Sequence, residues 1–190
     1  MERLKAYLRR IYRLSLNHSK KEDLVWKDLK KLSAEMEWRC GIYEKEKYIE
    51  TGFEIGNDKT ARFLYLINNK DFICIVNILE NFPVELTTDL FILAAHFNNL
   101  LNEGVVIIHT ENQCVEYHLK NDILVHLLYS GEIYGVITYH YNASKEIYWA
   151  FQRLIEENEA PAIIIADLLK KMEAEEEQNS KQQEINADMD

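Results

Sequence analysis

The spacing of apolar residues changes along the chain, and each change indicates a different kind of element. Near the N-terminus apolar residues recur every three or four positions, at Leu4, Leu8, Ile11, Val25, Leu29, Leu32 and Met36. Residues at this spacing share one face of a helix, so the pattern predicts amphipathic helices over 2–16 and 22–38. Ser19, with Glu22 three residues later, is the predicted N-cap of the second helix.

Three segments rich in β-branched and aromatic residues follow, at 48–56, 61–67 and 71–79. They are separated by the clusters "NDK" and "NNK", which favour turns and are too short for any connection except a hairpin. The pattern therefore predicts a meander of three antiparallel strands.

The next segment, "FPVELTTDLFILAAHFNNLLNEGVVIIHTENQCVEYH", combines a helix with a second hairpin. Pro83 precedes the predicted helix, and Thr87 or Thr88 is expected to cap its N-terminus. Gly104 is expected to end it as a C′ glycine. The segments "VVIIH" and "CVEYHL" then form a hairpin through "TEN", which brings the predicted sheet to about five strands.

A long apolar stripe at helical spacing begins near Ser130 and continues for about six turns, which is too long for a strand. Pro161 begins a last short helix that is expected to end near residue 175. Residues 176–190 are acidic and polar, and they predict a disordered tail.

The predicted fold class is therefore α+β, an antiparallel sheet of about five strands packed with helices in the order α-α-β-β-β-α-β-β-α-α. No linker divides the chain into separate domains. We expect the N-terminal amphipathic helices of residues 1–40 to form one compact unit with the main domain, residues 41–175.

Two of the predicted strands, 72–76 and 105–108, carry no polar residue on either alternating face. Such strands are expected where both faces of a sheet are covered. Helices of the chain could cover one face, and either the other long helices or a second copy of the chain would cover the other. We predict a homodimer. The candidate partner-binding residues are Phe72, Cys74 and Val76, or Ile73 and Ile75 on the opposite face, and the alternation does not choose between them.

Charge and length restrict the classes of protein to which this chain is expected to belong. The 190 residues are 47% hydrophobic, which is enough for one core, and the formal net charge of -10 argues against nucleic-acid binding. Basic residues predominate in 1–31 and acidic residues in 173–190. The basic segment is interpreted as a solvated helix face, with contact to anionic lipid or RNA as the weaker alternative. No apolar run approaches the roughly 18 residues of a membrane span, so we expect no membrane span and a cytoplasmic location.

No motif for catalysis is present, so the favoured prediction is a non-enzymatic protein without catalytic, cofactor-binding or metal-ligating residues. The three cysteines are far apart and form no C-x-x-C pair, and neither a phosphate-binding loop nor H-E-x-x-H nor G-x-S-x-G occurs. One alternative remains open. His109 and His118 flank the "TEN" hairpin, and a small-molecule or metal-binding enzyme would require a concave pocket in which these imidazoles converge with a carboxylate such as Glu116.

The segment "NFPVELTTDLFILAAHFNNLLNEGVVIIHTENQCVEYHLKNDI" resembles the YbjN-type family of bacterial sensory transduction regulators. In that family a proline-led helix ends in "LN..L..G" and is followed by strand, turn and strand. The matching residues here are Pro83, Asn98 or Asn99, Leu100, Leu101 and Gly104, and the resemblance covers roughly residues 48–158.

This resemblance implies a fold like that of class I type III secretion chaperones, a dimeric α/β sandwich. It also implies a chaperone-like or regulatory protein that binds a partner polypeptide. The family supplies no catalytic motif, so no catalytic residue is transferred.

Overall fold

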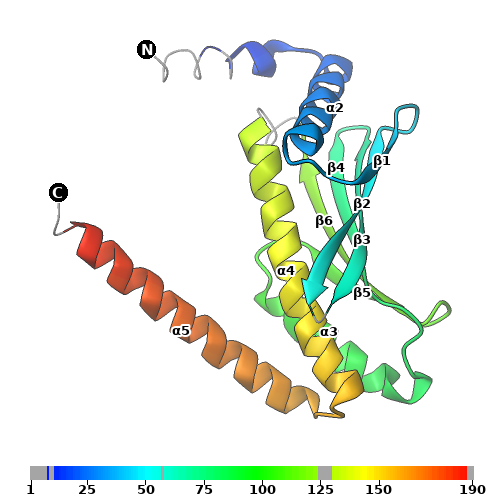
Figure 1. The fold of residues 1–190 in the computed structure, drawn as a ribbon, viewed down its shortest axis with the longest axis vertical. Helices are drawn as coiled ribbons and strands as arrows, with labels where there is room; N and C mark the ends of the chain where they lie inside the picture. The colour runs from blue at the N-terminus through cyan, green and yellow to red at the C-terminus, as the bar shows by residue number, and fades with distance from the viewer. Residues whose placement is uncertain (1–7, 9–10, 57, 124–129, 188–190) are drawn as a thin grey trace.

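The chain forms an α+β fold in which helices pack against one antiparallel sheet (Figure 1). The computed structural model describes residue 8 and residues 11–56, 58–123 and 130–187. Its elements in chain order are α2 (His18–Glu35), β1 (Cys40–Tyr43), β2 (Tyr48–Gly56), β3 (Lys59–Asn68), β4 (Asp71–Leu79), the 3-10 helix η1 (Val84–Leu86), α3 (Thr87–Leu100), β5 (Val105–His109), β6 (Cys114–Asp122), α4 (Ser130–Glu156) and α5 (Pro161–Ala187).

The sheet has the strand order β1-β2-β3-β4-β6-β5, and every neighbouring pair is antiparallel. The predicted fold class, meander and second hairpin are confirmed. The described sheet has six strands instead of about five, because the sequence pattern missed β1. That strand is only four residues long, and three of the four are exposed, so it shows no alternation of buried and exposed positions.

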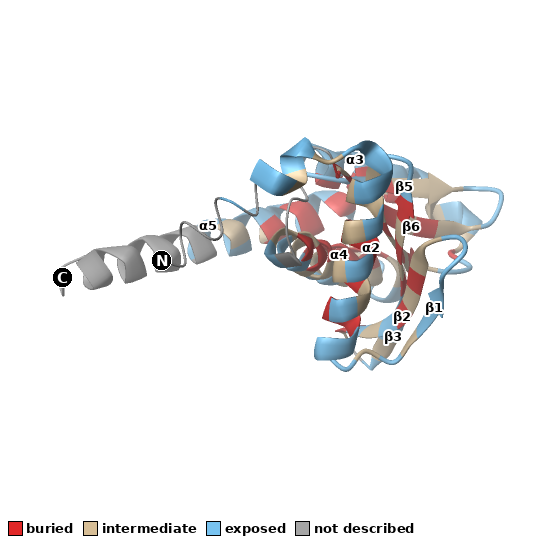
Figure 2. Ribbon diagram, turned by 90° about the horizontal axis from the view of Figure 1, so that it is seen from above, coloured by how far each residue is buried: buried red, intermediate tan, exposed pale blue. Residues whose placement is uncertain are grey.

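Helix α4 lies along one face of the sheet and makes the largest part of the core with it (Figures 1 and 2). The sheet contributes large buried aromatic residues, among them Phe63, Tyr65, Phe72 and Tyr117. Helix α4 contributes one fully or nearly fully buried stripe, Ile133, Ile137, His140, Ser144, Ile147, Phe151 and Leu154. The predicted long helix is therefore confirmed, and its spacing of three and four residues is what aligns this stripe with the sheet.

The N-terminal helical region differs from the prediction at its boundary. Residues 11–15 are helical, and most of the expected helix at 2–16 lies outside the described residues. Helix α2 begins at His18, and the Asn17 side chain caps it by accepting a hydrogen bond from Lys20 N at 3.0 Å. The predicted Ser19 cap is wrong, because α2 begins earlier than its apolar pattern and places Ser19 inside the first turn.

Helix α3 protects the outer edge of β5 through a single side chain. The Asn98 amide accepts a hydrogen bond from Val106 N at 2.7 Å and donates one to Val106 O at 3.1 Å. It therefore pairs with the edge strand as another strand would. Of the two asparagines in the motif, the structure assigns this contact to Asn98.

Both predicted caps of α3 are wrong. The N-cap is Leu86, and Thr87 instead donates its hydroxyl to Val84 O at 2.6 Å. The helix ends at Leu100, with Leu101 as an extended C-cap, so Gly104 is not its C′ residue. Gly104 has a φ of +88° in the turn that leads into β5, where its missing Cβ makes room for Tyr117.

The C-terminal helix is longer than predicted. Helix α5 continues to Ala187 and projects away from the body, whereas the sequence predicted a helix end near residue 175 and a disordered tail (Figure 1). The tail has no proline or glycine and is rich in Glu and Gln, which have high helix propensity. The prediction weighed only the lack of large apolar residues.

Gly104 and Gly135 form a matched pair for a stability test. A Cβ at Gly104 would lie 2.5 Å from Tyr117 Cε2 and 2.8 Å from His118 O, whereas a Cβ at Gly135 in α4 meets nothing within 4 Å. We expect Gly104→Ala to lower the free energy of unfolding by about 2 kcal/mol or more, through strain and overpacking. Gly135→Ala is expected to raise it by about 1 kcal/mol, through helix propensity.

Urea denaturation of the two variants beside the wild type measures both effects. Equal stability of Gly104→Ala and the wild type would contradict the tight fit of this turn against Tyr117.

Candidate functional site

The two faces of the sheet have different surroundings. Along β4, Phe72, Cys74, Val76 and Ile78 are 0% exposed beneath α4, while the residues between them are partly exposed. Among the described residues, no helix lies over the opposite face, which we call the open face (Figures 1 and 2). The open face consists of the outward-pointing residues of all six strands.

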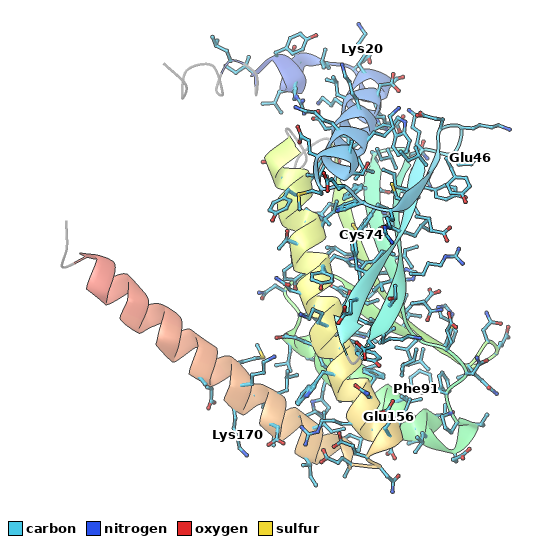
Figure 3. The ribbon with its side chains drawn as sticks, in the orientation of Figure 1. Lys20, Glu46, Cys74, Phe91, Glu156 and Lys170 are labelled. Atoms are coloured by element: carbon cyan, nitrogen blue, oxygen red, sulfur yellow. The ribbon has the colours of Figure 1, made fainter. Side chains whose placement is uncertain are left out.

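The first predicted interface, Phe72, Cys74 and Val76, is therefore placed in the core of a single chain, where no partner reaches it (Figure 3). Burial also raises the pKa of the Cys74 thiol well above its usual value, so this sulfur is not a nucleophile. The alternative pair, Ile73 and Ile75, lies on the open face. Docking of α4 makes the choice between faces that the alternation left undecided.

The centre of the open face is an apolar strip formed by Leu64, Leu66, Ile73 and Ile75. Leu64 pairs with Ile75 and Leu66 with Ile73 across β3 and β4, so the four side chains are direct neighbours. All four are partly exposed. The sequence prediction missed Leu64 and Leu66, although "FLYLI" in β3 is apolar at both alternating positions, which is the same signal that identified β4.

Ion pairs flank the apolar strip on both sides. Arg62 Nε lies 3.0 Å from Glu50 Oε1 on the β2 side, and Lys120 Nζ lies 2.9 Å from Asp71 Oδ2 on the β6 side. Each pair joins neighbouring strands of the same face. Glu50 and Asp71 are thus compensated within the face, and the centre stays apolar.

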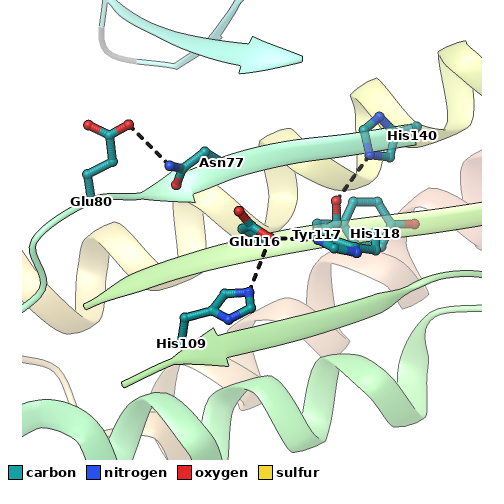
Figure 4. A network of polar contacts seen from close by, with 7 residues as sticks. All are labelled: Asn77, Glu80, His109, Glu116, Tyr117, His118 and His140. Carbon is teal, nitrogen blue, oxygen red and sulfur yellow. Dashed lines mark hydrogen bonds and ion pairs between the residues drawn. The ribbon is translucent and has the colours of Figure 1, made fainter. Parts of the chain in front are cut away.

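A second group on the open face consists of His109, Glu116 and His118 on the β5–β6 hairpin (Figure 4). Glu116 and His118 are two positions apart on β6 and share a face, and His109 at the end of β5 lies diagonally opposite Glu116. Glu116 Oε2 is 3.1 Å from His109 Nε2 and 2.7 Å from His118 Nε2. The convergence that the alternative hypothesis requires is confirmed, whereas the concave pocket that it also requires stays a prediction.

This group is open to solvent. The exposed fractions of the His109, Glu116 and His118 side chains are 38%, 27% and 28%. One ligand atom from each of the three residues lies within 4.8 Å of the other two. Two imidazoles and a carboxylate at these distances are suited to binding a metal ion.

His140 is the opposite case, a histidine enclosed in the core. Its ring stacks on Tyr117 with centroids 5.0 Å apart, and it meets the rings of Phe63 and Tyr65 edge-on. Nε2 is 3.4 Å from Tyr117 O (Figure 4). Burial lowers the pKa of His140 from 6.5 to about 3, although the Tyr117 carbonyl opposes this shift. The imidazole is therefore neutral in the folded protein.

An apolar groove of about 300 Å³ lies beside α4, on the covered side of the sheet. Its lining includes Trp38, Phe53 and Tyr141, and Phe53 contacts both other rings edge-on at 5.2 and 5.8 Å. Neither a carboxylate, an imidazole nor a thiol lines this groove. Its volume is at the lower end of the range of small-ligand pockets.

Comparison with known proteins adds no family to these observations. No protein-family model matches the chain, and no curated protein matches it. In the part of the chain that the structure describes, no helix combines the length and apolar character that crossing a membrane requires. The resemblance to the YbjN-type family therefore stays a prediction based on the motif of residues 81–123.

The buried His140 predicts a specific pH dependence of stability. Between pH 6.5 and about 3 the unfolded chain binds a proton at this imidazole that the folded chain does not bind. The free energy of unfolding therefore falls as the pH falls through this range, by up to about 1.4 kcal/mol per pH unit from this group. His140→Phe keeps a ring of similar size, removes the titration and is expected to flatten this dependence.

Urea denaturation at about pH 7.5 and about pH 5 measures the slope. His96→Ala, which removes an exposed histidine of α3, is the control and is expected to keep the wild-type slope. An unchanged slope in His140→Phe would show that other groups determine the acid sensitivity.

Proposed function

We propose that this protein is a non-enzymatic interaction module that associates with a second copy of itself through the open face. The observation that carries the proposal is the apolar strip of Leu64, Leu66, Ile73 and Ile75 at the centre of a sheet face that no described helix covers. Contiguous apolar surface of this kind is typical of interaction sites on soluble proteins. A second copy supplies a surface of the same shape and polarity.

The size of the open face supports a stable dimer. Strands β2, β3, β4 and β6 have nine or ten residues each. At about 3.3 Å per residue and about 4.8 Å between strands, these four span roughly 550–600 Å² before side-chain relief and β5 are added. Standard protein interfaces bury about 800 Å² per partner, so the face has the required extent.

The charge distribution also favours the open face for association between identical chains. The chain carries a formal net charge of -10, so two copies repel each other over most of their surfaces. On the open face, however, Glu50 and Asp71 are already paired with Arg62 and Lys120. Repulsion is therefore reduced beside the apolar strip.

The resemblance to the YbjN-type family extends the proposal to a chaperone-like or regulatory role. In this proposal the homodimer binds a partner polypeptide in the cytoplasm, and it contacts neither nucleic acid nor a membrane. The aromatic groove beside α4, whose described lining is mainly apolar and carries no carboxylate, imidazole or thiol, supports binding of an apolar group.

A second candidate function is a metal or small-molecule site at His109, Glu116 and His118. The confirmed convergence of these three side chains favours it. It does not exclude the dimer, because the group lies on the β5–β6 hairpin, at one side of the apolar strip.

Leu66→Lys tests the dimer. Leu66 lies on the apolar strip beside Ile73 and Tyr48 and away from the histidines. A lysine there stays solvated in a monomer but is buried without a partner in the dimer, which weakens association by more than about 100-fold. Light scattering of the purified chain in the presence of a metal chelator should give a dimer for the wild type and a monomer for the variant.

Phe91→Lys is the matched control, because Phe91 is an apolar residue of α3 that is 49% exposed and lies away from the open face (Figure 3). It should remain dimeric. A monomeric wild type, or a Leu66→Lys variant that still forms the dimer, would contradict the proposal. Recovery of a different protein by a monomeric wild type would instead assign the face to a heterologous partner.

A further inference from the structure

The histidine–glutamate group on the β5–β6 hairpin supports a more specific assignment. We propose that His109, Glu116 and His118 form a binding site for one divalent transition-metal ion, with Zn²⁺ as the ion that fits best. The proposal deepens the second candidate function, and it does not rest on the dimer.

The three side chains already converge on one point. Both imidazoles point Nε2 at the same oxygen, Glu116 Oε2, at 3.1 and 2.7 Å (Figure 4). Zinc bonds to nitrogen and carboxylate oxygen are about 2.0–2.2 Å long, which separates tetrahedral ligand atoms by roughly 3.4 Å. The three ligand atoms therefore rearrange around the ion from their present separations, which are all within 4.8 Å.

The backbone beneath the group keeps these residues together. Glu116 and His118 belong to β6, which is paired on one side with β4 and on the other with β5. His109 is paired with Cys114 at the turn end of the same hairpin. Ligands on paired strands lose less conformational freedom on binding than ligands on a loop, so the site is largely preorganised.

The ligand set selects the class of metal. Imidazole nitrogen suits zinc, copper, nickel and iron, whereas calcium and magnesium prefer sites made of oxygen atoms alone. Two histidines and one carboxylate therefore favour Zn²⁺ over the more abundant Mg²⁺. Three protein ligands leave a fourth tetrahedral position, which faces away from the sheet because all three side chains project from the open face.

Zinc titration of the full-length chain tests the site directly. After removal of metal with a chelator, isothermal titration calorimetry with ZnCl₂ should show one zinc ion per chain. His109→Ala and His118→Ala should each weaken binding by more than about tenfold, the loss that even an outer-shell partner can cause. Glu116→Gln keeps a side chain of the same size, removes the negative charge and should also weaken binding.

His96→Ala is the matched control, because it removes an exposed histidine of α3 outside this group. It should bind zinc as the wild type does, and circular dichroism should show that all four variants keep the fold. Co²⁺ provides a second readout, because its visible absorption reports a tetrahedral site with nitrogen and oxygen ligands.

Absence of zinc binding, or wild-type affinity in the His109→Ala and His118→Ala variants, would overturn the proposal. Equal competition by Mg²⁺ would overturn the assignment to a transition metal. None of these results bears on the dimer, because light scattering measures the dimer in a chelator, where the metal site is empty.

Discussion

The packing of α4 across one face of the sheet is the interaction on which the rest of this structure depends. Its buried stripe from Ile133 to Leu154 meets the inward-pointing residues of β2, β3, β4 and β6. The aromatic layer of Phe63, Tyr65 and Tyr117 closes around His140, so that the imidazole exists there only in its neutral form. Once this face is filled, the side chains on the other face have no cover within the described chain.

The edges of the sheet are poorly suited to association with another chain, which leaves the open face as the main candidate surface. An exposed strand edge invites pairing with another chain, and both edges here are protected. Asn98 satisfies Val106 at the β5 edge, and the opposite edge strand, β1, has only four residues. Association through strand addition is therefore disfavoured, and the apolar strip in the middle of the face remains the surface best suited to a partner.

The apolar strip and the histidine–glutamate group lie on the same face but depend on different interactions. Association through the strip depends on apolar area and on charges that are already compensated by Arg62 and Lys120. Metal binding depends on three atoms from two paired strands. Register connects the two, since Ile75 pairs directly with His118. Any molecule that covers the strip therefore comes close to the position that the three ligands leave open.

The sequence by itself determined the features that depend on local spacing. Strand β2 and the start of α5 agree with the predicted positions, and α4 is the predicted long helix, because each follows from a period of two or 3.6 residues or from a proline. The hairpin of β5 and β6, which carries His109 and His118, also follows from the sequence alone. The sequence did not predict features that lack such a period, including the short strand β1 and the Asn17 cap.

Only the tertiary structure decided which face of the sheet is open. An alternation of period two describes both faces of "DFICIVNIL" equally well, so Phe72 and Ile73 were equivalent until α4 covered one of them. Gly104 is a similar case, since its conformation is explained by Tyr117, thirteen positions later, and not by the helix before it. Local sequence encodes spacing, whereas burial is decided by which distant element packs against each side.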